Sequence, residues 1–253
     1  MNPSNLDEKC GFNRIIYLDN YFSVVLKQSG EICQTQDIKF DLAKIILPFA
    51  QKKLGFNLDF CQCVNRLDQP VTGLCVVAFN QDIFTKITSL FSEHKVKKTY
   101  LAIVEKTEFL QKKFSDKPWF SEELTGYIKF DNKKKKAFMV QKGKTGGKFA
   151  SLTYEIIGEG DRYFFIKVEP KTGRTHQIRC QLAAEGMFIK GDLKYGAKRS
   201  EKTGGIRLHA WRLEFVHPVT NKSLCFTSPP AFVDGLWQAC LDCQREILCA
   251  AKK

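Results

Sequence analysis

The sequence of 253 residues predicts a single α+β domain, on three observations. Short apolar runs rich in β-branched and aromatic residues recur along the chain, as is typical of strands. Between them lie segments whose apolar residues recur at helical spacing. No internal repeat and no long linker interrupts this order, so the strands and helices are expected to share one core. We expect residues 1–13 to form an N-terminal tail and residues 14–253 to form the domain.

The first predicted elements are two strands at residues 15–19 and 22–26, closed by a turn at 27–30. A helix is predicted over residues 41–54, where Gly55 marks its end and Pro48 predicts a kink or an earlier stop. A buried strand at 74–79 leads to a helix that Asn80 can cap, and a further strand follows at 99–104. The apolar face of the capped helix consists of Ile83, Phe84, Ile87, Leu90 and Phe91.

The second half begins with residues 105–148, which are predicted to be the least regular part of the chain. They include a run of four lysines at 133–136, which is either a solvated loop or a phosphate contact. A hairpin is predicted from residues 151–157 and 163–169, and a helix from 175 to 185, ended by Gly186. Strands at 206–216 and 224–227 and a helix from about residue 232 complete the predicted order.

The charge balance favours a polyanionic partner. Lysine and arginine number 40 against 27 aspartate and glutamate, a formal charge of +13. Such an excess favours nucleic acid as the partner, with a basic protein that has no such partner as the alternative. Hydrophobic residues make up 43% and charged residues 26%, which excludes a largely disordered or fibrous chain. Apolar runs fall short of the ~18–20 residues that span a bilayer, and the first residues are polar. We expect a cytoplasmic monomer that makes no membrane contact.

The ten cysteines are expected to be reduced and mostly buried, because no secretory signal precedes them. Cys240 and Cys243 form a Cys-x-x-Cys pair. A zinc or redox site there is disfavoured, because one pair supplies only two of the four ligands that structural zinc takes. No metal site is therefore expected.

Three segments carry charged residues where a core would not place them: 64–73, 97–100 and 170–179. In the first, Arg66 and Asp68 alone would be an ordinary surface pair. The third opens a helix with Arg174, His176 and Arg179. Because a helix N-terminus already favours anions, cations there indicate an anionic partner, either a phosphate or a carboxylate such as Asp68. A solvated helix face is the alternative.

These segments together resemble the RluA-type family of RNA pseudouridine synthases. Residues 65–74 (NRLDQPVTGL) resemble the family's H-R-L-D-x-x-T-S-G-L, and residues 98–104 (KTYLAIV) its K-x-Y-x-A-x-V strand. Residues 169–179 (EPKTGRTHQIR), with Leu182-Ala183 and the GDLKYG of 191–196, resemble its P-x-T-G-R-x-H-Q-I-R-x-H-L-A…G-D-x-x-Y-G block. The match runs in order from about residue 14 to 230.

The sequence departs from the family pattern at flanking positions. Asn65 replaces the usual His, Gln28 a typical Pro and Gln181 a common His, and residues 71–73 read VTG for TSG. These changes bear on the substrate more than on the reaction, because the pattern's Asp, Tyr and Arg are intact. The family's S4 RNA-binding module would find no room in residues 1–13.

The resemblance implies a mixed, largely antiparallel sheet flanked by helices, with a basic cleft. It implies an isomerase that flips a uridine out of ribosomal or transfer RNA and converts it to pseudouridine. Asp68 is then the catalytic group, a nucleophile or a stabiliser of charge at C1′, and Arg179 the cation that keeps it ionised. Tyr100 would stack on the flipped uracil and take part in proton transfer, and Ile178 would give an apolar contact.

Further residues would bind the RNA. Arg66 would fill the vacated space or hold the adjacent phosphate. Lys171, Arg174 and His176 would contact the backbone, and the lysine-rich segment 133–148 would follow the strand outside the cleft. Neither metal nor cofactor is expected, because uracil leaves and returns without an activated water and one carboxylate suffices. The alternatives are a non-catalytic RNA-binding protein of the same fold and a basic structural component of a ribonucleoprotein.

Overall fold

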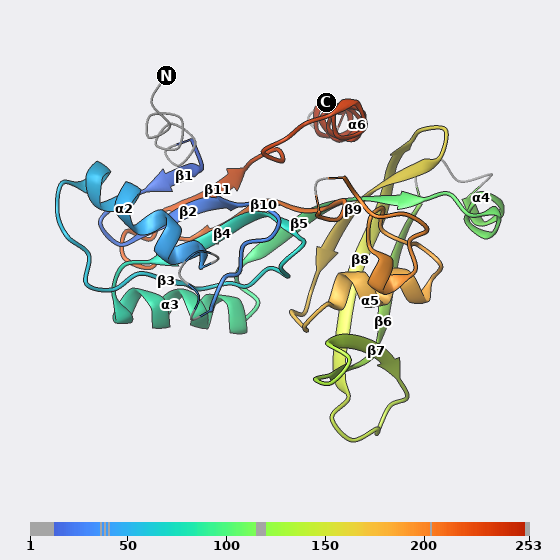
Figure 1. Cartoon of the computed structure of the whole chain (residues 1–253), viewed down its shortest axis with the longest axis horizontal. Coiled ribbons are helices and arrows are strands. Elements are labelled where there is room, and N and C mark those ends of the chain that lie inside the picture. Colours follow the sequence, from blue (N-terminus) through green and yellow to red (C-terminus); the bar gives the residue numbers. More distant parts are fainter. Residues whose placement is uncertain are drawn as a thin grey trace. The chain divides into compact units, whose positions relative to one another are not determined.

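The computed structural model describes residues 13–35, 37, 39, 41–114, 120–202 and 204–250, and the side chains up to residue 246. The predicted tail, residues 1–13, lies almost wholly outside the described residues. The fold is α+β, as predicted (Figure 1). The chain divides into two compact units: unit 1 is Met1–Lys97 with Ala210–Ala231, and unit 2 is Lys98–His209 with Phe232–Lys253. A single domain over 14–253 therefore stays a prediction.

Unit 1 is built on a β-sheet. Its strands are β1 (Ile15–Leu18), β2 (Phe22–Lys27), β3 (Gln62–Cys63), β4 (Thr72–Ala78), most of β10 (Leu208–Val216) and β11 (Ser223–Thr227). The order is β1-β2-β4-β10-β11, with β3 also paired to β4. The β1–β2, β2–β4, β3–β4 and β10–β11 pairs are antiparallel. Every residue of β2 is buried, because β1 and β4 flank it and helices cover the sheet. The predicted strand pair at the start of the chain is confirmed.

Two helices pack on this sheet. In α3 (Gln81–Ser92), the Asn80 side chain accepts a hydrogen bond from the Ile83 amide at 2.8 Å, so the predicted cap is confirmed. Ile83 and Ile87 face a core that includes Phe22, Val24, Leu74, Val76 and Phe215. The other helix, α2 (Leu42–Leu54), has Asp41 as its N-cap and Gly55 as its C-cap. It continues through Pro48, so the predicted early stop is wrong. Pro48 is exposed, which lets water solvate the carbonyl that lacks its helical partner.

The ends of two strands of unit 1 are joined by side chains. His217, at the turn after β10, contacts Asp19 through Nε2 at 2.8 Å. Asp19, at the turn after β1, also accepts a hydrogen bond from the Tyr17 hydroxyl at 2.6 Å. His217 Nδ1 accepts the amides of Val219 and Thr220, which assigns the Nε2–H tautomer. His217 thus links the turn after β10 to the turn after β1.

Unit 2 is built on β5 (Lys97–Glu105), β6 (Ser121–Asp131), β7 (Lys136–Val140), β8 (Lys148–Glu159) and β9 (Tyr163–Pro170), in the order β5-β9-β8-β6-β7. The pairs are antiparallel. The prediction of little regular structure over 105–148 is wrong, because this region holds α4 (Glu108–Phe114), β6 and β7. Few residues of β6 are buried, so its sequence carries only a weak apolar pattern. The strand is held by backbone pairing with β7 and β8.

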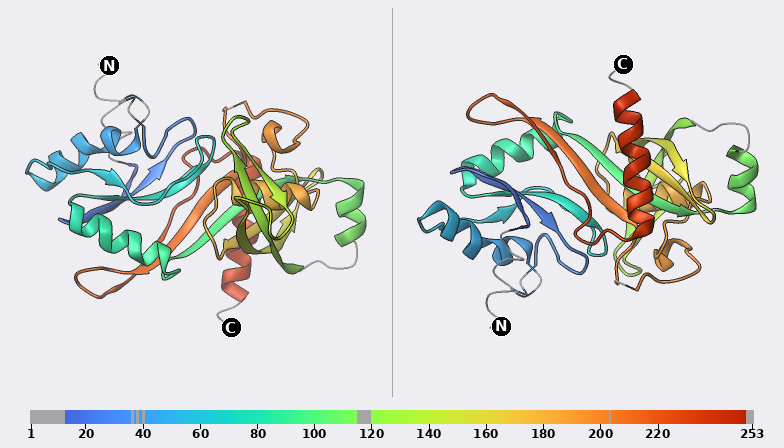
Figure 2. Two further views of the ribbon diagram at one scale, coloured as in Figure 1. Left: turned by 90° about the horizontal axis from the view of Figure 1, so that it is seen from below. Right: turned by 90° about the horizontal axis from the view of Figure 1, so that it is seen from above.

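Helices and one short turn complete unit 2: α5 (Gln177–Ala184), the 3₁₀ turn η1 (Leu193–Tyr195) and α6 (Gly235–Ala250). α5 contacts β6, β7 and η1, and α6 contacts β8, lying over the strands of its unit in Figure 2. α5 begins two residues later than predicted, because His176 has a left-handed φ of 56°. Among the described residues, no helix is long and apolar enough to cross a membrane.

Candidate active site

The loop that carries Asp68 joins β3 to β4 in unit 1. Asn65 fixes its start: Oδ1 accepts the Val76 amide at 2.7 Å, and Nδ2 donates to the Leu74 carbonyl at 3.3 Å. At the other end, the Val71 amide donates to the Asp68 carbonyl at 3.0 Å, which closes a turn. Asn65 stands where the family pattern has His, and its side chain forms hydrogen bonds with the backbone of β4.

Lys27 donates hydrogen bonds to the backbone of the same loop. Its side chain is fully buried at the end of β2. Nζ lies 3.2, 3.0 and 2.7 Å from the carbonyl oxygens of Asp68, Gln69 and Val71, and 3.0 Å from that of Gln28. Burial lowers the pKa of Lys27 from its ordinary value, and the surrounding carbonyl dipoles stabilise the ammonium form. The sequence predicts only a turn here, so this positioning role was missed.

A close approach of two strands explains the glycine of the motif. Gly73 has a φ of +129°, and a Cβ there would lie 2.4 Å from the Ala210 amide nitrogen. A side chain would therefore push β4 away from β10. With its backbone held in this way, the loop leaves the Arg66 side chain exposed and Asp68 half-buried.

The segment from Lys171 to Arg179 follows β9 in unit 2. Tyr100, on β5, is half-buried and pairs with Val168 of β9, so it lies on the strand beside the one that leads into this segment. Two buried polar side chains fold the segment onto β8. The Thr172 hydroxyl accepts the Ser151 amide at 3.0 Å and donates to Gln177 Oε1 at 2.7 Å. Gln177 Nε2 in turn donates to the Ser151 carbonyl at 3.0 Å.

Arg179 forms a buried ion pair with Asp192. Nε and Nη2 of Arg179 donate to the two carboxylate oxygens at 2.6 and 2.8 Å, and both side chains are at most 5% exposed. The guanidinium carbon lies 4.8 Å from the centre of the Tyr195 ring. A bidentate pair stacked on a ring fixes the plane of the guanidinium. The sequence left open a phosphate or a carboxylate such as Asp68 as the anion for this helix, and Asp192 is a carboxylate that the structure places on Arg179.

The remaining predicted binding residues lie on the same segment. His176 is half-buried: Nδ1 lies 2.9 Å from the Tyr195 hydroxyl, and its ring packs edge-on against Phe130. That hydroxyl also accepts the Ala137 amide at 2.7 Å. Ile178 is buried. Two exposed side chains have protein partners, Lys171 with Glu123 at 2.9 Å and Arg174 with the Phe149 carbonyl at 2.8 Å.

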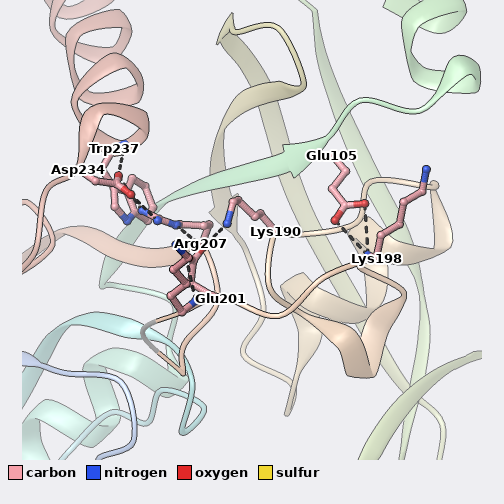
Figure 3. Close-up of polar contacts among 8 residues, drawn as sticks. Glu105, Lys190, Lys198, Glu201, Arg207, Asp234 and Trp237 are labelled. Carbon is pink, nitrogen blue, oxygen red and sulfur yellow. Dashed lines mark hydrogen bonds and ion pairs between the residues drawn. The ribbon is translucent and has the colours of Figure 1, made fainter.

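An ion-pair network anchors the loop that supplies Asp192 and Tyr195 (Figure 3). Glu201 Oε2 lies 2.7 Å from Arg207 Nε and 2.5 Å from Lys190 Nζ. Arg207 also pairs with Asp234, at 2.9 and 2.6 Å, and Asp234 accepts the Trp237 amide at the start of α6. Glu201 therefore holds the two ends of residues 190–207 together, and Arg207 ties them to Asp234 before α6.

The structure thus contains two separate groups of predicted site residues. Arg66 and Asp68 share one loop of unit 1, while unit 2 carries Tyr100 and the segment from Lys171 to Arg179. That the two groups form one site stays a prediction. Sequence reasoning missed Lys27 and the supporting roles of Thr172, Gln177, Asp192 and Tyr195. Only the family block containing residues 191–196 pointed near Asp192 and Tyr195.

Comparison with known proteins places the chain in a family. The family model described as RNA pseudouridylate synthase matches residues 21–184. The tRNA pseudouridine synthase C of Vibrio parahaemolyticus is 28% identical, covering 88% of this chain and 92% of the relative. The dual-specificity RNA pseudouridine synthase RluA of Pasteurella multocida is also 28% identical, covering 86% and 93%.

A solved structure with a similar fold was also found. The structure of human RNA pseudouridylate synthase domain containing 4 superposes with a TM-score of 0.69 at 19% identity, covering 95% of this chain and 96% of that one. The motifs that contain Asp68 and Tyr100, and most of the motif that contains Arg179, fall inside the residues that the family model matches. The chain therefore belongs to the RluA-type RNA pseudouridine synthases, the isomerases that convert uridine in RNA to pseudouridine.

Proposed function

We propose that this chain isomerises a uridine of transfer or ribosomal RNA and that Asp68 is its catalytic carboxylate. The RNA class is supported by the names of the relatives, which include tRNA and ribosomal large subunit synthases. The observation that carries the role of Asp68 is the way its loop is held. Lys27, Asn65 and the β4 backbone fix the loop before any RNA binds, while the carboxylate stays half-buried. A positioned carboxylate needs little reorganisation at the moment of reaction.

The chemistry requires one such group. The N1–C1′ bond of the uridine breaks, the uracil turns while still bound, and C5 forms the new bond to C1′. The proton on C5 is then lost and N1 gains one. Asp68 acts at C1′, either by adding to it or by stabilising its positive charge, and no water takes part.

Three residues of unit 2 complete the reaction site. Arg179 presents a cation whose plane Asp192 and Tyr195 already fix, which suits it to keep Asp68 ionised. Tyr100 stacks on the flipped uracil and assists proton transfer. Ile178 supplies the apolar contact. Each role rests on the family motif together with the placement of the residue on a strand or helix that the fold holds rigid.

RNA binding draws on the exposed cations. Arg66, which is exposed beside Asp68, fills the space of the flipped base or holds the neighbouring phosphate. Lys171, Arg174 and His176 contact the backbone, His176 with less freedom because its ring is packed. The exposed Lys133–Lys135 turn lies between β6 and β7 at the end of the unit 2 sheet (Figure 1). It contacts the RNA strand further from the reaction site. A basic cleft between these cations is part of the same proposal.

We also propose that the protein is a cytoplasmic monomer. The eight described cysteines are free, in keeping with a reducing compartment. Light scattering on the purified protein measures the mass, and a mass of about one chain supports the monomer; a dimer mass contradicts it.

The proposed function is tested by tritium release from RNA labelled at uridine C5. The substrates are transfer and ribosomal RNA from cells that lack this protein, and the enzymes are wild type and Asp68→Asn. We expect release by wild type and none by the variant, with RNA binding equal in both. Release by both enzymes, or by neither while binding is tight, contradicts the role of Asp68 and favours a non-catalytic RNA-binding protein.

A further inference from the structure

Three cysteines lie together in unit 1, directly behind the Asp68 loop. Cys33 Sγ lies 3.7 Å from Cys75 Sγ, and Cys33 and Cys63 line the same cavity. The strand register explains the grouping. Cys63 on β3 pairs with Val77 of β4, and Cys75 is two residues before Val77, so both cysteines point to the same face of the sheet. Cys33 reaches that face from the connection between β2 and α2.

Cys33 is the most acidic thiol of the three. The Leu67 amide donates to its sulfur at 3.3 Å, and the same sulfur lies 3.8 Å from the Leu67 carbonyl oxygen and 3.7 Å from Cys75 Sγ. Hydrogen bonding within the cluster lowers the pKa of Cys33 from its ordinary value and raises the pKa of Cys63 and Cys75. Such a thiolate is the nucleophile of a thiol pair, and a neighbouring protonated thiol can resolve it.

A cavity of about 240 Å³ gives access to two of the three sulfurs. Cys33 and Cys63 line it, together with Thr35, Asp41 and Lys44, while Cys75 does not. The space is enough for a small peroxide, which needs a few water volumes. Cys61 lines the same cavity, but its thiol donates to the Ala43 carbonyl, and burial raises its pKa. Cys63 is therefore the thiol at the cavity that is left to react with an oxidised Cys33, because Cys75 does not line the cavity.

We propose that Cys33 and Cys63 form a redox-active pair that a hydroperoxide converts reversibly to a disulfide. The Cys33 thiolate attacks the peroxide, the O–O bond breaks, and sulfenic acid and hydroxide form. The Cys63 thiol then attacks the Cys33 sulfur, the S–S bond forms, and water leaves with the sulfenic oxygen. Two electrons pass from the thiol pair to the peroxide, and an external dithiol returns them.

The same pair controls the Asp68 loop, an effect that rests on the proposed function. In the reduced protein, the Cys33 sulfur accepts the amide of Leu67, one residue before Asp68, at 3.3 Å. A disulfide sulfur carries no charge and is a poor acceptor, and closing the bond draws Cys33 toward β3. Oxidation thus removes one support of the loop while Lys27 and Asn65 keep theirs, and it slows the isomerisation.

The test starts from the reduced full-length protein, treated with hydrogen peroxide, blocked with N-ethylmaleimide and digested without reductant. We expect mass spectrometry to find the Cys33 and Cys63 peptides linked, with two hydrogens lost, and separated by dithiothreitol. Tritium release should fall at least tenfold on oxidation and recover with dithiothreitol. Cys63→Ser should give no link and leave a Cys33 sulfenic acid that dimedone traps.

The matched control is Cys225→Ser, which removes an exposed thiol of the same unit and should keep the link and the response. A link from Cys33 to Cys61 or Cys75, cluster thiols that peroxide leaves unmodified, or a zinc ion on the purified protein that shields them, overturns the pair. A Cys33–Cys63 link with unchanged release overturns its control of the loop. If the reduced enzyme releases no tritium, the proposed function fails, and the peptide map still decides the chemistry.

Discussion

The Asp68 loop and the Arg179 segment are held in opposite ways. Lys27 and Asn65 bind main-chain groups around Asp68, so these two contacts hold the backbone of the loop whichever side chain stands at position 68. Arg179, in contrast, is itself half of a buried ion pair, and Asp192 has Arg179 as its bidentate partner. One region fixes its functional residue through the backbone, and the other through that residue's own side chain.

The difference teaches which residue can be changed without loss of the fold. A carboxylate carried on a preformed loop can be replaced with little structural cost. A guanidinium that neutralises a buried carboxylate cannot, because its removal leaves an uncompensated charge. A variant of Arg179 can therefore lose activity through lost chemistry or through lost stability. A variant of Asp68 is expected to lose activity through lost chemistry.

The largest predicted effects come from substituting Asp68 or Arg179. Asp68→Asn should lower kcat by at least about 10³-fold and change the free energy of unfolding by less than about 1 kcal/mol. Arg179→Met should lower the free energy of unfolding by about 3–5 kcal/mol, because Asp192 stays buried and charged. Urea denaturation and tritium release measure the two quantities for each variant.

A double variant serves as the control for Arg179. Arg179→Met with Asp192→Leu removes both charges and should regain most of the stability, while activity stays lost. Recovery of activity along with stability would show that Arg179 acts only through the fold. Equal destabilisation by Asp68→Asn and Arg179→Met would remove the contrast between the two regions.

A smaller effect is predicted at Lys27, the positioning residue of the backbone-held loop. Lys27→Met keeps the length of the side chain and removes its donors, which should cost about 1–3 kcal/mol of stability and lower kcat by about 10- to 100-fold. With the loop loosened, KM should change less than kcat. Equal kcat in wild type and Lys27→Met would exclude a positioning role.

Lys27 also predicts a pH dependence. Because burial lowers its folded pKa below the ordinary 10.5, the unfolded chain binds the proton more tightly in the interval between the two values. The stability of wild type relative to Lys27→Met should therefore rise as the pH increases through that interval toward 10.5. Urea titrations of both proteins at several alkaline pH values give the difference, and a constant difference contradicts the prediction.

Local patterns predicted the fold where each element carries its own signal. The cap at Asn80 and the apolar face after it define α3, and alternation with turn residues defines the β8–β9 hairpin. β6 and β7 escaped prediction because few of their residues are buried and a run of lysines separates them. Their structure depends on pairing with β8, which no local pattern contains.

The candidate site was predictable only as far as its motifs. Asp68, Tyr100 and Arg179 were identified because they fall within family patterns. Lys27 reaches the Asp68 carbonyl across 41 residues, and Asp192 reaches Arg179 across 13. Such contacts arise from tertiary packing, so spacing in the sequence gave no signal for them.

The smallest predicted effect concerns the lysine turn between β6 and β7. Lys133, Lys134 and Lys135 are exposed, whereas Lys136 is half-buried with Nζ 4.9 Å from the centre of the Tyr195 ring, so the first three can be changed without disturbing the fold. Replacing them with alanine should lower the slope of log Kd against log salt by up to about 2 and leave kcat at saturating RNA unchanged. The control with the same charge change replaces Lys44, Lys52 and Lys53, which are exposed on α2. If the turn contacts phosphates, the first triple variant changes the slope and the second does not; equal slopes would mean that the turn adds only to the net charge.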